Sequence, residues 1–311
     1  MTTIHDAVQD YLRLRRSLGF KLVQHGQLLP GFADFLTSSG AEHITTELAL
    51  AWATAPTDAQ SGWYRMRLGM VRGLATYLHA IDPAHQVPPP GLLTRGYDRP
   101  VPYLFTTEDI TALTRAAARL PGRRHALTYQ TYITLLAITG IRPGEAIRLD
   151  RYDLDPDAEI LTIAESKYGR SRRLLLHPST TVALESYLDQ RDRYRGGRAG
   201  PAFFTSATGN RLWRSDVEKQ FRALASHVGL RPRSARCRPV PIGLRHSFAV
   251  TTLTGWYRAG VDVQAHLPVL STWLGHEEPK NTYWYLQASP ELLALAADRM
   301  TDTHQQQENG R

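Results

Sequence analysis

A run of prolines and glycines between residues 83 and 103 sets the strongest limit on how this chain can fold. The run contains Pro83, Pro88-Pro89-Pro90-Gly91, Gly96, Pro100 and Pro102. Proline fixes φ and lacks a backbone N–H, so neither a long helix nor a central strand can pass through this stretch. The chain of 311 residues is therefore predicted to form two domains. We expect them at 1–83 and 104–302, joined by a linker at 84–103 and followed by a polar tail at 303–311.

Apolar periodicity predicts a helical first domain and a change of pattern within the second. Met70, Leu74 and Leu78 recur at helical spacing, and the first domain carries no strand pattern. In the second domain, the segments Ile160-Leu-Thr-Ile-Ala-Glu and Arg172-Arg-Leu-Leu-Leu flank Lys167-Tyr-Gly-Arg-Ser, which predicts a β-hairpin. Helices are expected over residues 129–139, 180–195, 216–228, 244–258 and 261–274, and a last one begins at Ser289-Pro290. The expected fold is mostly α with a small antiparallel β-sheet.

The net charge is concentrated in the second domain. The chain holds 37 Lys plus Arg against 29 Asp plus Glu, a net charge of +8, and only four of the 37 are lysines. Residues 1–95 hold eight basic and seven acidic side chains, which leaves 29 against 22, or +7, for the remainder. Because the planar guanidinium fits phosphate oxygens two at a time, this excess favours a polyanionic partner. The alternative is a solvated surface that reflects an arginine-rich coding bias.

Several classes of protein are disfavoured by what the sequence lacks. Cys237 is its single cysteine, which excludes an internal disulfide and a multi-cysteine zinc site. No run approaches the roughly 18 apolar residues of a membrane span, and the first residues lack the layout of a secretory signal. Walker, GxGxxG, HExxH and GxSxG motifs do not occur, which disfavours nucleotide, zinc and serine-hydrolase sites. We therefore expect a cytoplasmic protein with no membrane association.

A widely spaced set of polar residues marks element junctions in the second domain. It comprises Thr139-Gly-Ile-Arg142-Pro-Gly-Glu145-Ala, Lys167 in the hairpin, Gly243-Leu-Arg245-His246-Ser-Phe-Ala, Leu274-Gly-His276, and Tyr285 in Asn281-Thr-Tyr-Trp-Tyr285. Each block alone has an ordinary explanation: Arg142 as a helix-end cation, Lys167 as a solvated turn residue, His276 as a capping histidine. Tyr285 alone is equally consistent with a packed aromatic cluster. The functional information lies in the order and spacing of the whole set.

In these blocks the sequence resembles the tyrosine recombinase (phage integrase) family, over roughly residues 100–300. The first 95 residues match in kind, as a helical segment of the size of that family's DNA-binding, core-binding domain. The resemblance implies site-specific cutting and rejoining of DNA strands. The opening Tyr11-Leu-Arg-Leu-Arg-Arg-Ser-Leu-Gly-Phe also looks like integrases and transposases of mobile elements. Double-stranded DNA would be the partner, with a dimer at each site, a tetrameric synapse, and other recombinases or accessory factors as further partners.

The resemblance also assigns the chemistry of strand cleavage, without a metal or cofactor. Tyr285 is the nucleophile that forms a 3′-phosphotyrosine, because a phenolate can leave a covalent link for later resealing. Arg142 and Arg245 clamp the scissile phosphate, whose negative charge increases in the transition state. Lys167 is the general acid for the departing 5′-oxygen. A lysine suits that role because the pKa of an arginine is too high for proton donation.

Three further residues are assigned by the same resemblance. His276 matches the position that hydrogen-bonds the phosphate. Glu145 resembles the carboxylate that orients the site, and His246 takes a supporting position beside Arg245. The arginines Arg170, Arg172, Arg173, Arg236 and Arg238 are predicted to contact DNA phosphates, although each charge run is equally consistent with a solvated surface.

One position departs from the family pattern. The family's second block usually reads His-x-x-Arg, but Ile242 stands three residues before Arg245. An isoleucine can neither accept the proton of the tyrosine nor donate to the phosphate. Losing one of several acid–base groups reduces a rate by about 10²–10⁴ without abolishing the chemistry. Two alternatives stay open: a DNA-binding accessory subunit that has lost cleavage, and a monomeric type IB topoisomerase-like enzyme.

Overall fold

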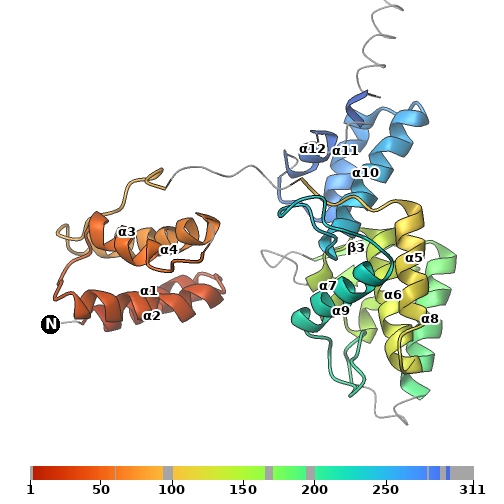
Figure 1. Ribbon diagram of the computed structural model, residues 1–311, viewed down its shortest axis with the longest axis horizontal. Coiled ribbons are helices and arrows are strands. Elements are labelled where there is room, and N and C mark those ends of the chain that lie inside the picture. The colour runs from red at the N-terminus through yellow and green to blue at the C-terminus, as the bar shows by residue number, and fades with distance from the viewer. Residues whose placement is uncertain are drawn as a thin grey trace, which may run out of the picture. The chain divides into compact units, whose positions relative to one another are not determined.

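The chain forms two compact units in a computed structural model, one comprising Met1–Arg99 and the other Pro100–Arg311 (Figure 1). The structure describes residues 3–59, 61–93, 101–164, 171–193, 200–278, 280–287 and 292–294. We refer to the two bodies as unit 1 and unit 2. In the described residues, no helix is long and apolar enough to cross a membrane.

Unit 1 consists of helices packed around one apolar core. Its helices are α1 (Ile4–Ser17), α2 (Val23–Ser38), α3 (Thr46–Thr54) and α4 (Ser61–His79). Thr3 caps α1 through a reciprocal hydrogen-bonded pair with Asp6, which satisfies backbone N–H groups that have no partner within the helix. Met70, Leu74 and Leu78 are buried on one side of α4, as their spacing predicts. The described part of unit 1 contains no strand.

Unit 2 consists mainly of helices around two apolar clusters. The helices are α5 (Thr107–Ala118), α6 (Arg123–Thr139), α7 (Pro143–Arg148), α8 (Pro178–Arg193), α9 (Arg214–His227), α10 (Ile242–Arg258), α11 (Val263–Leu274) and α12 (Lys280–Gln287). The smaller cluster is built mainly from α10, α11 and α12. The central helix α6 packs against α5, α8 and α10. Its buried residues include Tyr132, Ile133 and Leu136, each fully excluded from solvent. Thr139, the last residue of α6, is 2% exposed, so the C-terminal end of this helix is buried within the unit.

A small antiparallel sheet interrupts the helices of unit 2, and it confirms the predicted hairpin. The strands β1 (Leu154–Asp155), β2 (Ile160–Ile163) and β3 (Arg172–Leu175) lie in the order β1-β2-β3. The register pairs Ile160 with Leu175 and Ile163 with Arg172. Alternate residues are buried, so one face of the sheet packs on the core. Lys167 and Arg170, which the sequence places between β2 and β3, lie outside the described residues.

The proline-rich stretch belongs partly to each unit. On the side of unit 1, Arg72 donates through Nε to the carbonyl of Pro88, and Gln86 N–H donates to the carbonyl of Ile44. On the side of unit 2, Tyr103, the last residue of the predicted linker, is buried in the core. Prolines that cannot enter a helix still offer carbonyl acceptors, so these ends of the predicted linker pack as ordered chain. Its middle, residues 94–100, lies outside the described residues.

The predicted last helix and tail are largely beyond what the structure describes. Residues 292–294 are helical, whereas Ser289, Pro290 and the segment 303–311 lie outside the described residues.

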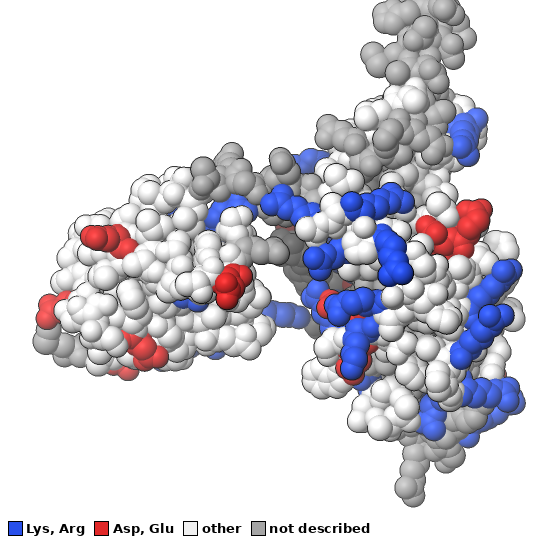
Figure 2. Space-filling view, in the orientation of Figure 1, with Lys and Arg blue, Asp and Glu red and all other residues white. Residues whose placement is uncertain are grey.

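On the face drawn in Figure 2, lysine and arginine side chains gather over unit 2, consistent with the charge split along the sequence.

Candidate active site

The turn that follows α6 positions the first arginine of the site. Gly140 ends the helix with a φ of 63°, in the left-handed region that favours glycine. A Cβ at this position would lie 2.5 Å from Cδ1 of Phe248, so the packing also demands glycine. The chain then turns into α7, and Arg142 directly precedes the proline at the first helical position. A left-handed glycine and a helix-starting proline therefore fix the backbone on both sides of Arg142.

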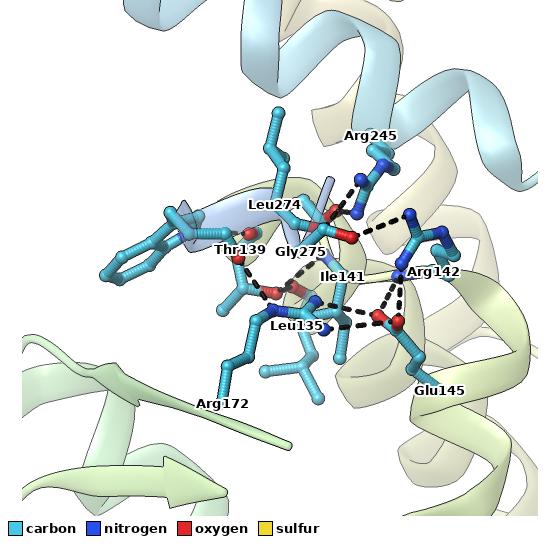
Figure 3. Close-up of polar contacts among 11 residues, drawn as sticks. Leu135, Thr139, Ile141, Arg142, Glu145, Arg172, Arg245, Leu274 and Gly275 are labelled. Carbon is cyan, nitrogen blue, oxygen red and sulfur yellow. Dashed lines mark hydrogen bonds and ion pairs between the residues drawn. The ribbon is translucent and has the colours of Figure 1, made fainter. Parts of the chain in front are cut away.

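Two backbone turns hold both arginines of the predicted clamp by their nitrogens. Arg142 donates through Nη2 to the carbonyl of Gly275 at 3.1 Å. Arg245, on the first turn of α10, donates through Nη1 to Gly140 at 2.9 Å and through Nη2 to Leu274 at 2.7 Å (Figure 3). Arg245 is only 2% exposed to solvent. Burial, and secondly the charge of Arg142, lowers the pKa of Arg245 to about 10, so the guanidinium remains charged near neutral pH.

A buried carboxylate anchors the clamp from the other side. Glu145, 3% exposed, accepts hydrogen bonds from Nη1 of Arg142 at 2.8 Å and from its backbone N–H at 2.9 Å. It also receives Nη1 and Nη2 of Arg172, at 3.2 and 2.8 Å. Burial alone would raise the pKa of this carboxyl. The hydrogen bonds and charge of Arg172, joined by those of Arg142, outweigh burial and hold the pKa at about 2.

Arg172, which the sequence predicts at a DNA-contacting surface, is directed into the protein instead. Besides its two bonds to Glu145, Arg172 donates through Nε to the carbonyl of Trp273 at 2.7 Å, and its side chain is only 9% exposed. All three guanidinium nitrogens are thus engaged inside the protein. The strand alternation carries the signal for this, because Arg172 shares a face of β3 with the buried Leu174, whereas Arg173 lies on the exposed face.

Helix α12 brings the predicted nucleophile to two histidines. Tyr285 is 2% exposed, and its Oη lies 3.3 Å from Nδ1 of His246. Its ring stacks on the ring of His276 with centroids 6.0 Å apart. His276 in turn contacts Thr282, which is fully buried, with 2.8 Å between Nδ1 and Oγ1. Thr282 is not among the predicted site residues, although it stands three residues before Tyr285, on a neighbouring position of the same helix.

Both histidines are held in the neutral form. Burial, and secondly the positive charge of Arg245, lowers the pKa of His276 to about 3 and that of His246 to about 4. A neutral imidazole has one nitrogen that donates and one that accepts. The site therefore combines fixed positive charge on the arginines with uncharged groups that can exchange a proton beside the tyrosine.

The structure brings together most of the predicted site residues, and leaves others at the surface. Arg142, Glu145, Arg245, His246, His276 and Tyr285 form one connected cluster. Ile242 opens α10, one turn before His246. Arg173, Arg236 and Arg238 are exposed, as a contact with an external phosphate requires. Lys167 and Arg170 lie outside the described residues.

This architecture and cluster define the class of protein. The phage integrase family model matches residues 104–291, and the chain belongs to that family. Among its relatives, "Putative integrase/recombinase y4rB" of Sinorhizobium fredii is 44% identical over 96% of this chain and 98% of that protein. The tyrosine recombinase XerD of Mycobacterium leprae is 30% identical over 93% of this chain and 95% of that protein.

A solved structure has a similar fold. A lambda integrase dimer bound to a COC′ core site aligns with a TM-score of 0.65 at 17% identity. The alignment covers 90% of this chain and 94% of the lambda chain. The predicted mostly α architecture with a small antiparallel sheet is therefore confirmed as that of the integrases.

Proposed function

We propose that this chain is a site-specific DNA recombinase that cuts and rejoins strands through a 3′-phosphotyrosine on Tyr285. The observation that carries the proposal is that two fixed arginines, Arg142 and Arg245, lie near a tyrosine whose hydroxyl contacts a histidine, and that Arg245 interacts electrostatically with both Arg142 and Tyr285. The family supports it, and so do the relatives, which are named as an integrase/recombinase and a tyrosine recombinase.

The proposed cleavage is a transfer of one phosphoryl group. The Tyr285 oxygen loses its proton and bonds to phosphorus, while the bond from phosphorus to the 5′-oxygen breaks. Arg142 and Arg245 stabilise the extra negative charge on the non-bridging oxygens, an effect worth about 10²–10³ in rate for each donor. The 5′-oxygen takes a proton, and the family resemblance assigns that donation to Lys167. His276 would hydrogen-bond the same phosphate.

Double-stranded DNA is the proposed partner, in assemblies of two chains on each site and four in the synapse. The charge of +7 on residues 96–311 supports an anionic partner, and the exposed Arg173, Arg236 and Arg238 are suitable phosphate ligands. The lambda integrase, which has the same fold, is a dimer on its core site. Integration or transposition of a mobile element is the proposed biological use, supported by the integrase/recombinase name of the 44% identical relative.

Covalent trapping tests the proposal. The wild-type chain is incubated with duplexes of randomised sequence that carry one nick at a fixed place, so that a short fragment diffuses away after cleavage and resealing is blocked. Protein–DNA adducts that survive denaturation are recovered and sequenced, and a recovered duplex serves as the substrate for all variants. We expect Tyr285→Phe to abolish the adduct and to retain DNA binding.

Tyr283→Phe is the matched control, because it makes the same change two residues earlier on α12, on a side chain that is 45% exposed. It should form the adduct as wild type does. Binding without an adduct would instead favour the accessory-subunit alternative, which Ile242 motivates. Relaxation of supercoiled DNA without transfer of the bound strand to a second duplex would favour the topoisomerase-like alternative.

A further inference from the structure

Helix α10 lacks a proton acceptor where the family usually carries one. That position is Ile242, whose hydrocarbon side chain has no group that can take a proton. His246 stands four residues further along the same helix. Residues four apart lie on the same face of an α-helix, one above the other. The imidazole of His246, one turn later, therefore lies on the same face of α10 as a histidine at position 242 would.

The contacts of Tyr285 single out this histidine. Its Oη lies 3.3 Å from Nδ1 of His246, and the two rings have centroids 5.6 Å apart at 52°. His276 also touches the tyrosine, but stacks on it at 19°, and its Nδ1 is engaged with Thr282. Of these two histidines, His246 is the one with a ring nitrogen within hydrogen-bond distance of the hydroxyl.

We propose that His246 is the catalytic residue that accepts the proton of Tyr285 when the tyrosine attacks DNA, in place of the histidine that is missing at Ile242. This inference rests on the proposed recombinase function. In the forward step, the O–H proton of Tyr285 moves to Nδ1 of His246 as the tyrosine oxygen bonds to phosphorus. The bond to the 5′-oxygen breaks, and that oxygen is protonated by the general acid. In resealing, the imidazolium returns its proton to the tyrosine.

The charges around His246 suit a base that acts only when DNA is present. The groups that face it are Arg245, His276, Tyr285 and the ring of Trp284. Burial and the charge of Arg245 keep the pKa of His246 near 4, so the imidazole is neutral. In the tautomer that carries its proton on Nε2, the lone pair of Nδ1 faces the hydroxyl of Tyr285. A phosphodiester seated on Arg245 would neutralise part of that charge. It would thereby raise the basicity of His246 at the moment of attack.

The test uses His246→Gln and a substrate that distinguishes the loss of the general base from the loss of the general acid. Glutamine keeps a polar group beside the hydroxyl but is far too weak a base to take its proton. We expect adduct formation on the selected nicked duplex to slow by about 10²–10⁴-fold, with DNA binding retained. His227→Gln, on an exposed position at the end of α9, is the control and should match wild type.

The same duplex is then prepared with sulfur in place of the bridging 5′-oxygen at the scissile phosphate. A thiolate leaves without a proton, because the pKa of a thiol is far below that of an alcohol. Lys167→Ala should therefore recover on the sulfur substrate, whereas His246→Gln should stay slow. Ile242→His added to His246→Gln should restore adduct formation on both substrates, because it returns an imidazole to the same face of α10.

The outcomes separate the inference from the function on which it rests. A Tyr285-dependent adduct that forms at the wild-type rate in His246→Gln would overturn the role of His246 and leave the recombinase intact. Recovery of His246→Gln on the sulfur substrate would also overturn it, because that variant would then lack an acid rather than a base. No adduct from the wild-type chain would overturn the proposed function, and this inference with it.

Discussion

Glu145→Gln tests the buried network that holds the phosphate clamp. The carboxylate is paired with Arg142 and Arg172, and its pKa falls from an ordinary 4.5 to about 2. One pKa unit corresponds to about 1.36 kcal/mol, so a difference of about 2.5 units amounts to about 3 kcal/mol of folding free energy. Removing one partner of a buried ion pair typically lowers the free energy of unfolding by about 3–5 kcal/mol, which agrees with this value. The variant should therefore lose about 3 kcal/mol of unfolding free energy at pH 7.

The pH dependence of that loss gives the sharper check. Because the folded pKa of Glu145 is depressed, its stabilisation is fully present above pH 4.5 and is lost as pH falls toward 2. Urea unfolding of the full chain, fitted for the transition of unit 2, should give a difference between wild type and Glu145→Gln that falls to about half at pH 3. The buried histidines are common to both chains and largely cancel in the comparison.

Glu185→Gln supplies the control for this measurement. Glu185 is exposed on α8, and surface substitutions of this kind usually change stability by less than about 0.5 kcal/mol. Two results would contradict a structural role for the Glu145 carboxylate: a Glu145→Gln chain that loses less than about 1 kcal/mol at pH 7, or a difference that does not change between pH 7 and pH 3. The carboxylate would then not be the anchor that the geometry describes.

Three further substitutions probe other parts of the account. Gly140→Ala should lower the free energy of unfolding by about 1–3 kcal/mol and lower the melting temperature with it, because its Cβ would collide with Phe248 at a positive φ. An unchanged transition in calorimetry would contradict this prediction. Thr282→Val should cost about 1–3 kcal/mol in urea unfolding, because Nδ1 of His276 loses its buried partner; a neutral result would mean that the contact carries no net energy. Arg236→Ala should weaken DNA binding and lower the slope of log affinity against log salt by about 1, and an unchanged slope would exclude a phosphate contact at that position.

Much of the fold can be predicted because it depends on residues that are close together in the sequence. The stop of α6 at Gly140 follows from a glycine that tolerates positive φ, and it is visible in the sequence alone. The hairpin of β2 and β3 follows from two short apolar runs around a turn, and the observed pairing of Ile160 with Leu175 agrees with it. These features depend on neighbouring residues, so a single sequence contains the information that specifies them.

The parts that sequence reasoning missed depend on partners far along the chain. Arg172 resembles a surface charge until its partner Glu145, 27 residues earlier, is placed beside it. The alternation along β3 assigns it to the buried face, but a buried arginine is costly without a paired carboxylate, and only the fold supplies that pairing. His246 and Tyr285 are 39 residues apart, and no spacing rule for a helix or strand joins them.

In the proposed mechanism Tyr285 becomes covalently bonded to DNA, and mass spectrometry of the trapped adduct measures this bond directly. After digestion of the protein and the DNA, the peptide that contains Tyr285 should carry a nucleotide through its 3′-phosphate, with fragment ions that assign the added mass to that tyrosine. Attachment at Tyr283 or at any other residue would contradict the account, as would DNA binding by the wild-type chain with no modified peptide.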